Sequence, residues 1–349
     1  MIRRRIASLT AVTLLAAGPA ALRAQDGADA SKPVQVFVIM GQSNTLEMGK
    51  VKGPEGSLEH AVKEEKLYPF MVDDAGSWSK RDDVRNVHVM GSGGPGKTRQ
   101  MRNDWLTVSG RKVGIEQGIG HKLGDAIDAP VLILKSSIGN RSLGWDILPP
   151  GSESYEFTDP KDGKTYVYAG YGQSPDRWLK GTEPKPIGWS AGLQYKGDVA
   201  RAKAVLKDLG KYYPGATEYE VKGFLWWQGD KDRYNAGHAQ KYGENLVRLV
   251  AALREEFDAP DAKFVCATLG QTDKDDAKGN ERAILEGMMA LSDAEQNPDL
   301  KGSVATVYTH PLSMGSASNA HYGGNAKTYM NVGLAMGDAM VELLRAKPR

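Results

Sequence analysis

Residues 34–44 read VQVFVIMGQSN, an apolar run from Val34 to Met40 that ends abruptly in Gly41-Gln42-Ser43-Asn44. A run of this length, rich in β-branched residues and bounded by glycine and polar residues, is typical of a buried strand. Such a strand places Ser43 on a sharp turn at the carboxyl edge of a sheet, where backbone and side chain can both face a substrate. Ser43 is therefore a candidate nucleophile.

Similar runs recur along the chain, with helical patterns between them. The predicted strands are 34–40, 86–90, 131–135, 221–227, 263–269 and, more weakly, 304–309. Near-continuous apolar runs indicate strands that are buried on both faces of a parallel sheet. Apolar residues at helical spacing predict helices around 199–209, 246–257 and 332–343. The alternation predicts an α/β fold, a three-layer α/β/α sandwich with a mainly parallel sheet, whose ligands bind at the carboxyl ends of the strands.

The 349 residues, with 40% hydrophobic and 25% charged, are enough for one large α/β domain. Residues 1–24 have a basic start, an Ala-rich apolar stretch and a small-residue cleavage point, which predicts a signal peptide. We therefore expect a single domain over 25–349, exported to the periplasm or the outside of the cell. No later stretch approaches 18 uninterrupted apolar residues, so we predict no membrane span.

Charge and cysteine content exclude several classes of function. Residues 1–24 carry four arginines and no acid, so the formal net charge changes from +2 to −2 without them. A nearly neutral protein has no global field for nucleic acid. Cys266 is the only cysteine and lies in an apolar run, which predicts a buried strand residue and no catalytic thiol. The histidines lack the spacing of metal ligands, so we expect no metal site.

Two segments interrupt the strand and helix pattern. Residues 50–83 are charged and loop-like, and residues 146–190 are rich in glycine, proline and aromatic residues without a regular period. A long irregular segment within a domain is more often functional than idle. The aromatic residues either bind a ligand or pack against one another, and the sequence leaves both alternatives open.

The chain also contains the parts that acyl transfer needs: a nucleophile, a base and hydrogen-bond donors for the oxyanion. Ser43 follows the first predicted strand, Gly139 the third and Gln228 the fourth, so all three should meet at one edge of the sheet. The backbone N–H groups of Ser43 and Gly139 and the Gln228 amide can then donate to an oxyanion. His321 precedes the C-terminal helix on a loop that can reach this edge, although a loop histidine without a task is the alternative.

Four motifs in this order carry a family resemblance: G-Q-S-N, K-x-x-x-G, W-x-Q-G-[DE], and a histidine ahead of the final helix. Over about residues 34–340 the chain resembles the SGNH hydrolases, and among them the sialate O-acetylesterase-like and acetylxylan-esterase-like carbohydrate esterases. The resemblance implies a flavodoxin-like fold, no cofactor and an acetylated carbohydrate as substrate. It makes Ser43 the nucleophile, His321 the base, and Ser43 N–H, Gly139 N–H and Gln228 the oxyanion hole. We expect the substrate to be bound by Gln42, Asn44, Asn140, Trp227 and Tyr322.

One position departs from the family pattern. Many members carry an aspartate three residues before the catalytic histidine, and Ser318 occupies that position here. Asp230 is our first candidate for the acid partner of His321, because it is charged and lies near Gln228, and Asn319 is the second. A Ser-His pair without an acid remains possible, as does a carbohydrate-binding protein with decayed catalysis. The sugar, the position of its ester and the oligomeric state are not predicted.

Residues 91–98, GSGGPGKT, match the phosphate-binding pattern G-x-x-x-x-G-K-[ST] and follow a predicted strand. The next residues lack the apolar stripe of a helix, and no later strand closes with an aspartate directly after its apolar run, as magnesium binding would need. We therefore interpret 91–98 as a glycine-rich loop at the edge of the site and predict no nucleotide binding.

Overall fold

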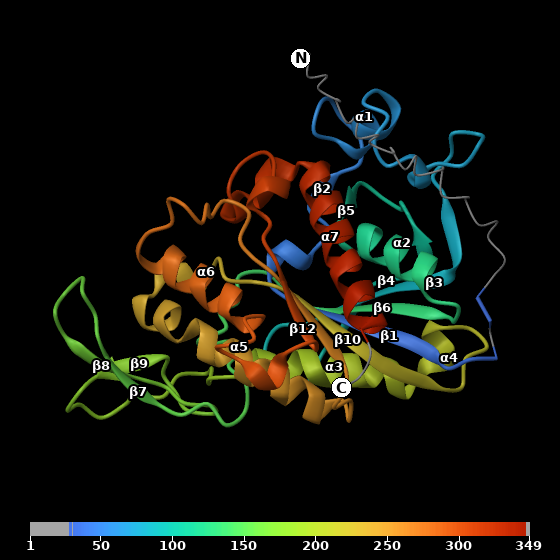
Figure 1. The fold of residues 1–349 in the computed structure, drawn as a ribbon. Coiled ribbons are helices and arrows are strands. Elements are labelled where there is room, and N and C mark those ends of the chain that lie inside the picture. The colour runs from blue at the N-terminus through green and yellow to red at the C-terminus, as the bar shows by residue number, and fades with distance from the viewer. Residues whose placement is uncertain (1–27, 30, 347–349) are drawn as a thin grey trace, which may run out of the picture.

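The computed structural model describes residues 28–29 and 31–346, and this part of the chain folds around a seven-stranded sheet (Figure 1). The predicted signal peptide, 1–24, lies outside the described residues. The strand order is β12-β11-β10-β1-β6-β3-β4, and neighbours are parallel except β3 and β4, which are antiparallel. The strands are β1 (Val34–Gly41), β3 (Lys80–Met90), β4 (Arg99–Thr107), β6 (Val131–Ser136), β10 (Tyr219–Trp227), β11 (Lys263–Ala267) and β12 (Val304–Val307).

This sheet confirms the predicted fold class. Numbered along the chain, the strands β1, β6, β10, β11 and β12 have the order 2-1-3-4-5, which is the flavodoxin order. The β3–β4 hairpin extends this sheet beyond β6. In a sheet of this order the chain leaves β1 toward β6 on one side and leaves the neighbouring strand β10 toward β11 on the other. The crevice of the fold therefore opens at the carboxyl end of β1, next to Ser43.

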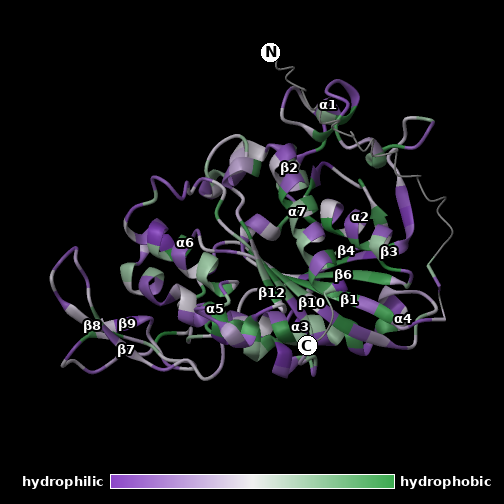
Figure 2. Cartoon of the chain, viewed as in Figure 1, coloured by the Kyte–Doolittle hydropathy of each residue, from purple (hydrophilic) through white to green (hydrophobic). Residues whose placement is uncertain are grey.

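Helices cover both faces of the sheet (Figure 1). The helices on one face are α2 (Glu116–Ala126) and α7 (Ala326–Arg345); those on the other are α3 (Leu193–Lys207) and α5 (Ala236–Glu256), with α6 (Gly279–Leu291) packed on α5. Val36 and Val38 of β1 contribute to one core and Phe37 and Ile39 to the other, which explains the uninterrupted apolar run. The central strands β1 and β6 are accordingly hydrophobic along most of their length (Figure 2). Within the described ranges, no helix has the length and apolarity that crossing a membrane requires.

Residues 50–83 are mostly irregular, as predicted, and contain the short helix α1 (Leu58–Lys63). The remaining short elements are α4 (Leu209–Tyr212), β2 (Gly49–Lys50) and β5 (Lys112–Val113). We expected residues 146–190 to be irregular, and this prediction was wrong. This segment forms a three-stranded antiparallel sheet of β7 (Tyr155–Thr158), β8 (Thr165–Tyr168) and β9 (Arg177–Leu179). We call residues 151–190 the arm; in Figure 1 its sheet projects to the left of the domain.

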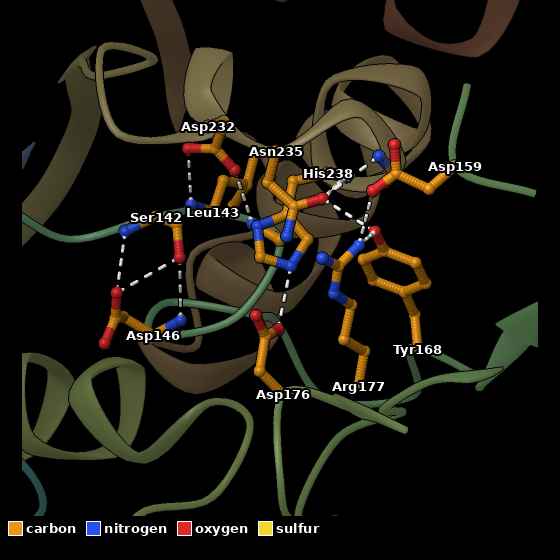
Figure 3. A network of polar contacts seen from close by, with 12 residues as sticks. Ser142, Leu143, Asp146, Asp159, Tyr168, Asp176, Arg177, Asp232, Asn235 and His238 are labelled. Carbon is orange, nitrogen blue, oxygen red and sulfur yellow. Dashed lines mark hydrogen bonds and ion pairs between the residues drawn. The ribbon is translucent and has the colours of Figure 1, made fainter. Parts of the chain in front are cut away.

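The arm is tied to the domain by a polar network (Figure 3). The Nε2 atom of His238, on α5, lies 2.9 Å from Oδ1 of Asp176 in the arm. The Tyr168 hydroxyl donates to Oδ1 of Asn235 at 2.8 Å and accepts from Nη1 of Arg177 at 2.8 Å. Because His238 and Asn235 belong to the domain, these contacts fix the base of the arm to α5.

Candidate active site

The turn that carries Ser43 is held in place from two sides. Gly41 has φ +145°, and a Cβ atom there would lie 2.6 Å from the Trp227 carbonyl oxygen, so the approach of β1 to β10 requires glycine. The hydroxyls of Thr45 and Ser137 share a 2.7 Å hydrogen bond, which joins the turn to the loop after β6. Ser43 opens a short 3₁₀ turn and is 8% exposed.

Gly139 lies against Ser43, as the strand order predicted. A Cβ atom built on Gly139 would lie 3.5 Å from the Ser43 Cβ. Within the described residues, neither the Ser43 N–H nor the Gly139 N–H donates a hydrogen bond. Two backbone donors without acceptors beside a serine hydroxyl have the composition of an oxyanion hole.

Gln228 is placed differently from our expectation. Its side chain is fully buried, and Nε2 donates to Gln42 Oε1 at 3.1 Å, to the Arg141 carbonyl at 2.8 Å and to Asp232 Oδ2 at 2.6 Å. Its Oε1 accepts from the Tyr242 hydroxyl at 3.0 Å. An amide has only two hydrogens, so these acceptors leave none for a substrate. In this structure Gln228 joins the loops after β1, β6 and β10.

Asp232 is a structural residue of the site that the sequence did not reveal. It is fully buried and accepts hydrogen bonds from the Leu143 N–H at 2.9 Å and the Gly144 N–H at 2.8 Å, in addition to the bond from Gln228 (Figure 3). Burial raises the pKa of Asp232, although these three bonds act in the opposite direction. In the sequence, Asp232 is the second acid of W-Q-G-D-K-D, and this pattern does not distinguish a buried carboxylate from one on the surface.

His321 lies in the 3₁₀ segment η6 (Ser318–Gly324), which packs against the turn that carries Ser43. It has a left-handed backbone conformation, φ 51°, and its carbonyl accepts a hydrogen bond from the Tyr329 hydroxyl at 3.3 Å. The side chain is half-buried. Within the part of the chain that is described, neither ring nitrogen has a hydrogen-bond partner, so both are available for catalysis.

The expected partner of His321 makes other contacts. Oδ1 of Asp230 accepts from Ser318 Oγ at 2.7 Å and from Arg233 Nε at 2.8 Å. Among the described residues, Asp230 forms neither a hydrogen bond nor an ion pair with the His321 ring. The direct pairing that we expected is thus not present, because the Asp230 carboxylate is bonded to Ser318, the first residue of η6, and to Arg233. Asn319 is exposed, and its side chain has no hydrogen bond to a described residue.

The five residues expected to bind substrate differ in their exposure. Asn140 is exposed, with φ 57°, but Gln42, Asn44, Trp227 and Tyr322 are buried. The rings of Trp227 and Tyr322 stack 5.6 Å apart, and Trp227 Nε1 donates to the Thr268 carbonyl at 2.8 Å. These two side chains therefore support the site from beneath. Asn140 is the one residue of the five that is exposed, and its contact with a substrate stays a prediction.

A buried ionic cluster underlies the turn that carries Ser43. Lys135, the lysine of K-x-x-x-G, is fully buried, and its Nζ lies 2.7 Å from Glu116 Oε2 and 3.2 Å from Glu47 Oε1. His88 Nδ1 lies 3.3 Å from Glu47 Oε2. Burial raises the pKa of Glu47, but the charge of Lys135 and the contact with His88 together outweigh burial and hold this pKa well below the usual range. Lys135 thus connects the segment after Ser43 to β6 and α2.

The resemblance of 91–98 to a phosphate-binding loop has no structural counterpart. The loop joins β3 to the antiparallel strand β4, whereas phosphate binding in that motif requires a helix at this point. Cys266 is buried in β11. Over the described ranges, no group of three or more His, Cys, Asp or Glu residues is placed to hold a metal ion.

Comparison with known proteins identifies the family. Three similar solved structures are a protein from Arabidopsis thaliana (15% identity, 88% of this chain and 98% of that chain, TM-score 0.48), a carbohydrate acetylesterase from Xanthomonas citri (15%, 87% and 56%, 0.48) and NanS (16%, 81% and 78%, 0.43). No curated protein matches the chain. Residues 167–342, just over half of the sequence, match a carbohydrate esterase family described as sialic acid-specific acetylesterase. The chain therefore belongs to this family of carbohydrate esterases.

Proposed function

We propose that this protein is an exported serine esterase that removes O-acetyl groups from a carbohydrate through a covalent acyl-enzyme. The observation that carries the proposal is that Ser43 lies beside Gly139 and that, among the described residues, neither backbone N–H donates a hydrogen bond. The turn that carries Ser43 also packs against the segment that carries His321. The family match covers His321 but neither Ser43 nor Gly139, so the roles of these two residues rest on geometry.

In the proposed reaction, His321 takes the proton of the Ser43 hydroxyl while Oγ attacks the acetyl carbonyl carbon. The Ser43 and Gly139 N–H groups donate to the oxygen that becomes negative. When the tetrahedral intermediate collapses, the sugar oxygen leaves and receives the proton from His321. A water molecule, deprotonated by His321, then attacks the acetyl group on Ser43, and His321 returns the proton to the Ser43 oxygen as acetic acid leaves.

We propose Asp230 and Ser318 as the positioning residues of His321. The Ser318 hydroxyl gives its hydrogen to Asp230, so its lone pairs remain to accept from a ring N–H. Ser318 and Asp230 are both buried, which strengthens a charge-assisted hydrogen bond. Asp230 would thus act on His321 through Ser318, whereas the aspartate of the family pattern acts on the histidine directly.

Labelling with a fluorophosphonate, which reacts with activated serines, tests the proposal. Mass spectrometry should locate the label on Ser43, and His321→Ala should abolish it. The labelled protein should lose its activity toward acetylated sugars. The alternative, a carbohydrate-binding protein with decayed catalysis, is motivated by Ser318 in place of an acid. It predicts sugar binding without labelling and without acetate release.

Export is a separate part of the proposal and is supported by the sequence of residues 1–24. Expression of the full chain in a Gram-negative host should yield a protein in the periplasm or the medium whose N-terminus follows residue 24. Retention of residues 1–24 on a cytoplasmic protein would contradict export.

A further inference from the structure

A cavity of about 830 Å³ lies between the arm and the helices α5 and α6, which are labelled in Figure 1. The arm contributes Ser152 and Tyr155 to its wall, and α5 contributes Asn245 and Arg248. A volume of this size is within the range of small-molecule binding sites. None of the described residues that line the cavity is among those placed around Ser43, so the cavity is separate from the candidate active site.

Asn245 is the residue of this wall that packing alone does not explain. It is 7% exposed, and within the described part of the chain neither Oδ1 nor Nδ2 of its amide has a hydrogen-bond partner. A buried amide without partners destabilises the folded state, and a leucine of similar shape would occupy the same place without that cost. The asparagine therefore indicates a partner from outside the chain.

Two further groups at the cavity lack partners among the described residues. The Tyr155 hydroxyl, on the arm, is buried without a hydrogen bond, although the Tyr155 ring is fixed by stacking on Tyr168 at 5.0 Å. Arg248 makes neither a hydrogen bond nor an ion pair, and its Nη1 would lie 3.3 Å from a Cβ atom built on Gly151. Arg248 also lines a neighbouring cavity of about 510 Å³, together with Lys203 of α3. Because the two cavities share Arg248, they form one groove along α5.

The charges around the first cavity are of both signs. Lys241 Nζ lies 2.7 Å from Glu244 Oε2, and Glu153 and Arg248 are exposed at the wall. An anion would meet the carboxylates of Glu153 and Glu244, and a cation would meet Lys241 and Arg248. An apolar ligand would leave the Asn245 amide unpaired. The ligand that fits this wall is neutral and carries hydroxyl groups.

We propose that the groove along α5 is a second, non-catalytic binding site for a neutral oligosaccharide chain. Asn245 Oδ1 accepts from a hydroxyl of one sugar unit, and Arg248 donates to hydroxyls of the next unit, toward the neighbouring cavity. The inference goes beyond the proposed esterase function, because binding here needs neither Ser43 nor His321. A protein held on a carbohydrate chain through this groove keeps its active site at a high effective concentration of further acetyl groups on the same chain.

The test uses the Ser43→Ala protein, titrated calorimetrically with four unacetylated hexasaccharides: xylohexaose, cellohexaose, mannohexaose and the acidic hexagalacturonate. At least one neutral hexasaccharide should bind, and hexagalacturonate should bind no more tightly. Asn245→Leu and Arg248→Gln, each added to this protein, should weaken binding about 2- to 10-fold, the range for a neutral hydrogen bond. Asn245→Leu should unfold at the same or a higher temperature, since it removes an unpaired buried amide.

Arg282→Gln, at an exposed arginine of α6 that lines neither cavity, is the matched control and should leave binding unchanged. Absence of binding by all three neutral hexasaccharides, tighter binding of hexagalacturonate, or binding that neither Asn245→Leu nor Arg248→Gln weakens would overturn the inference. A lower unfolding temperature in Asn245→Leu would make Asn245 a structural residue and would overturn it as well. Because every titration uses Ser43→Ala, a wild type without esterase activity would refute the proposed function and leave this test intact.

Discussion

Ser43 and His321 lie almost at opposite ends of the described chain, on two turns that pack against each other, and we propose that they act together. Ser43→Ala and His321→Ala should each lower kcat on p-nitrophenyl acetate by roughly 10³-fold or more, since residues that act as one unit each remove most of the shared catalysis. Circular dichroism and thermal unfolding should match the wild type. Near-normal turnover by a folded Ser43→Ala protein would eliminate this site.

Gln228 makes a different prediction, because its amide hydrogens are already used within the protein. Gln228→Ala should lower kcat and also the free energy of unfolding, by about 1–3 kcal/mol for the buried partners that it leaves unpaired. Tyr242→Phe, which removes the hydroxyl contacts to the Gln228 carbonyl and Oε1 but leaves the amide hydrogens in place, is the matched control. A loss of kcat with unchanged urea unfolding would instead make Gln228 a direct oxyanion donor, as its sequence motif suggested.

The hydrogen bond from Ser318 to Asp230 joins η6 to the loop that follows β10. Asp230→Asn and Ser318→Ala should each lower kcat/KM roughly 10- to 100-fold, and the double variant should lose much less than the product of the two effects. Ser318→Asp should recover activity in the Asp230→Asn background. Independent, multiplicative losses without this recovery would exclude the coupling.

The elements that the sequence failed to predict have recognisable causes. α2 packs through Gly118, Gly120 and Gly124, where a Cβ atom would meet neighbouring atoms at 2.4–2.6 Å, so its buried face has little of the apolar spacing that predicts a helix. β4 is an edge strand with mostly polar, accessible residues. The strands of the arm have three or four residues and lie outside the main core. By contrast, α5 and α7 bury one continuous stripe each, and both were predicted.

His121 on α2 gives the fold a dependence on pH. Its buried ring lies 4.7 Å from the Phe70 ring, and burial, followed by the charge of Arg81, lowers its pKa to about 4. An unfolded chain takes up this proton near pH 6.5, so stability should fall as pH drops from about 6.5 to about 4, by at most roughly 1.4 kcal/mol per unit.

His121→Gln should remove this contribution. Urea unfolding at pH 7 and pH 4.5 would measure it as a smaller loss of stability in the variant than in the wild type. Parallel losses in His121→Gln and the wild type would contradict the role of His121.

For the molecule as a whole, the sequence predicted the meeting of Ser43, Gly139 and the Gln228 loop, because parallel strands bring their carboxyl ends to one edge regardless of distance along the chain. It could not predict how the side chains divide their hydrogen bonds there. Whether Gln228 donates to a substrate or to Asp232, and whether Asp230 meets His321 or Ser318, depends on atoms brought together only by folding. For the same reason, the buried pairing of Lys135 with Glu47 and Glu116 has no periodic signal.

The arm extends the molecule beyond the domain, and its aromatic residues fall into two groups. Tyr155 and Tyr168 stack 5.0 Å apart, and Trp178 packs against the buried residues Leu148 and Ala169. Tyr166 is partly exposed, with the Arg177 guanidinium 4.3 Å from its ring centre. Self-packing accounts for the first group, and we predict that Tyr166 stacks on a sugar.

Tyr166→Ala should therefore raise KM for acetylated oligosaccharides about 2- to 10-fold, the range for an aromatic contact, and leave p-nitrophenyl acetate hydrolysis unchanged. The reason is that stacking on a distant sugar unit adds binding energy away from the reacting carbonyl, which a small ester cannot use. Trp178→Ala, which opens the apolar cluster, should lower the unfolding temperature as well. If Tyr166→Ala reduces kcat/KM equally on both kinds of substrate, the arm supports the fold of the site and makes no contact with the carbohydrate.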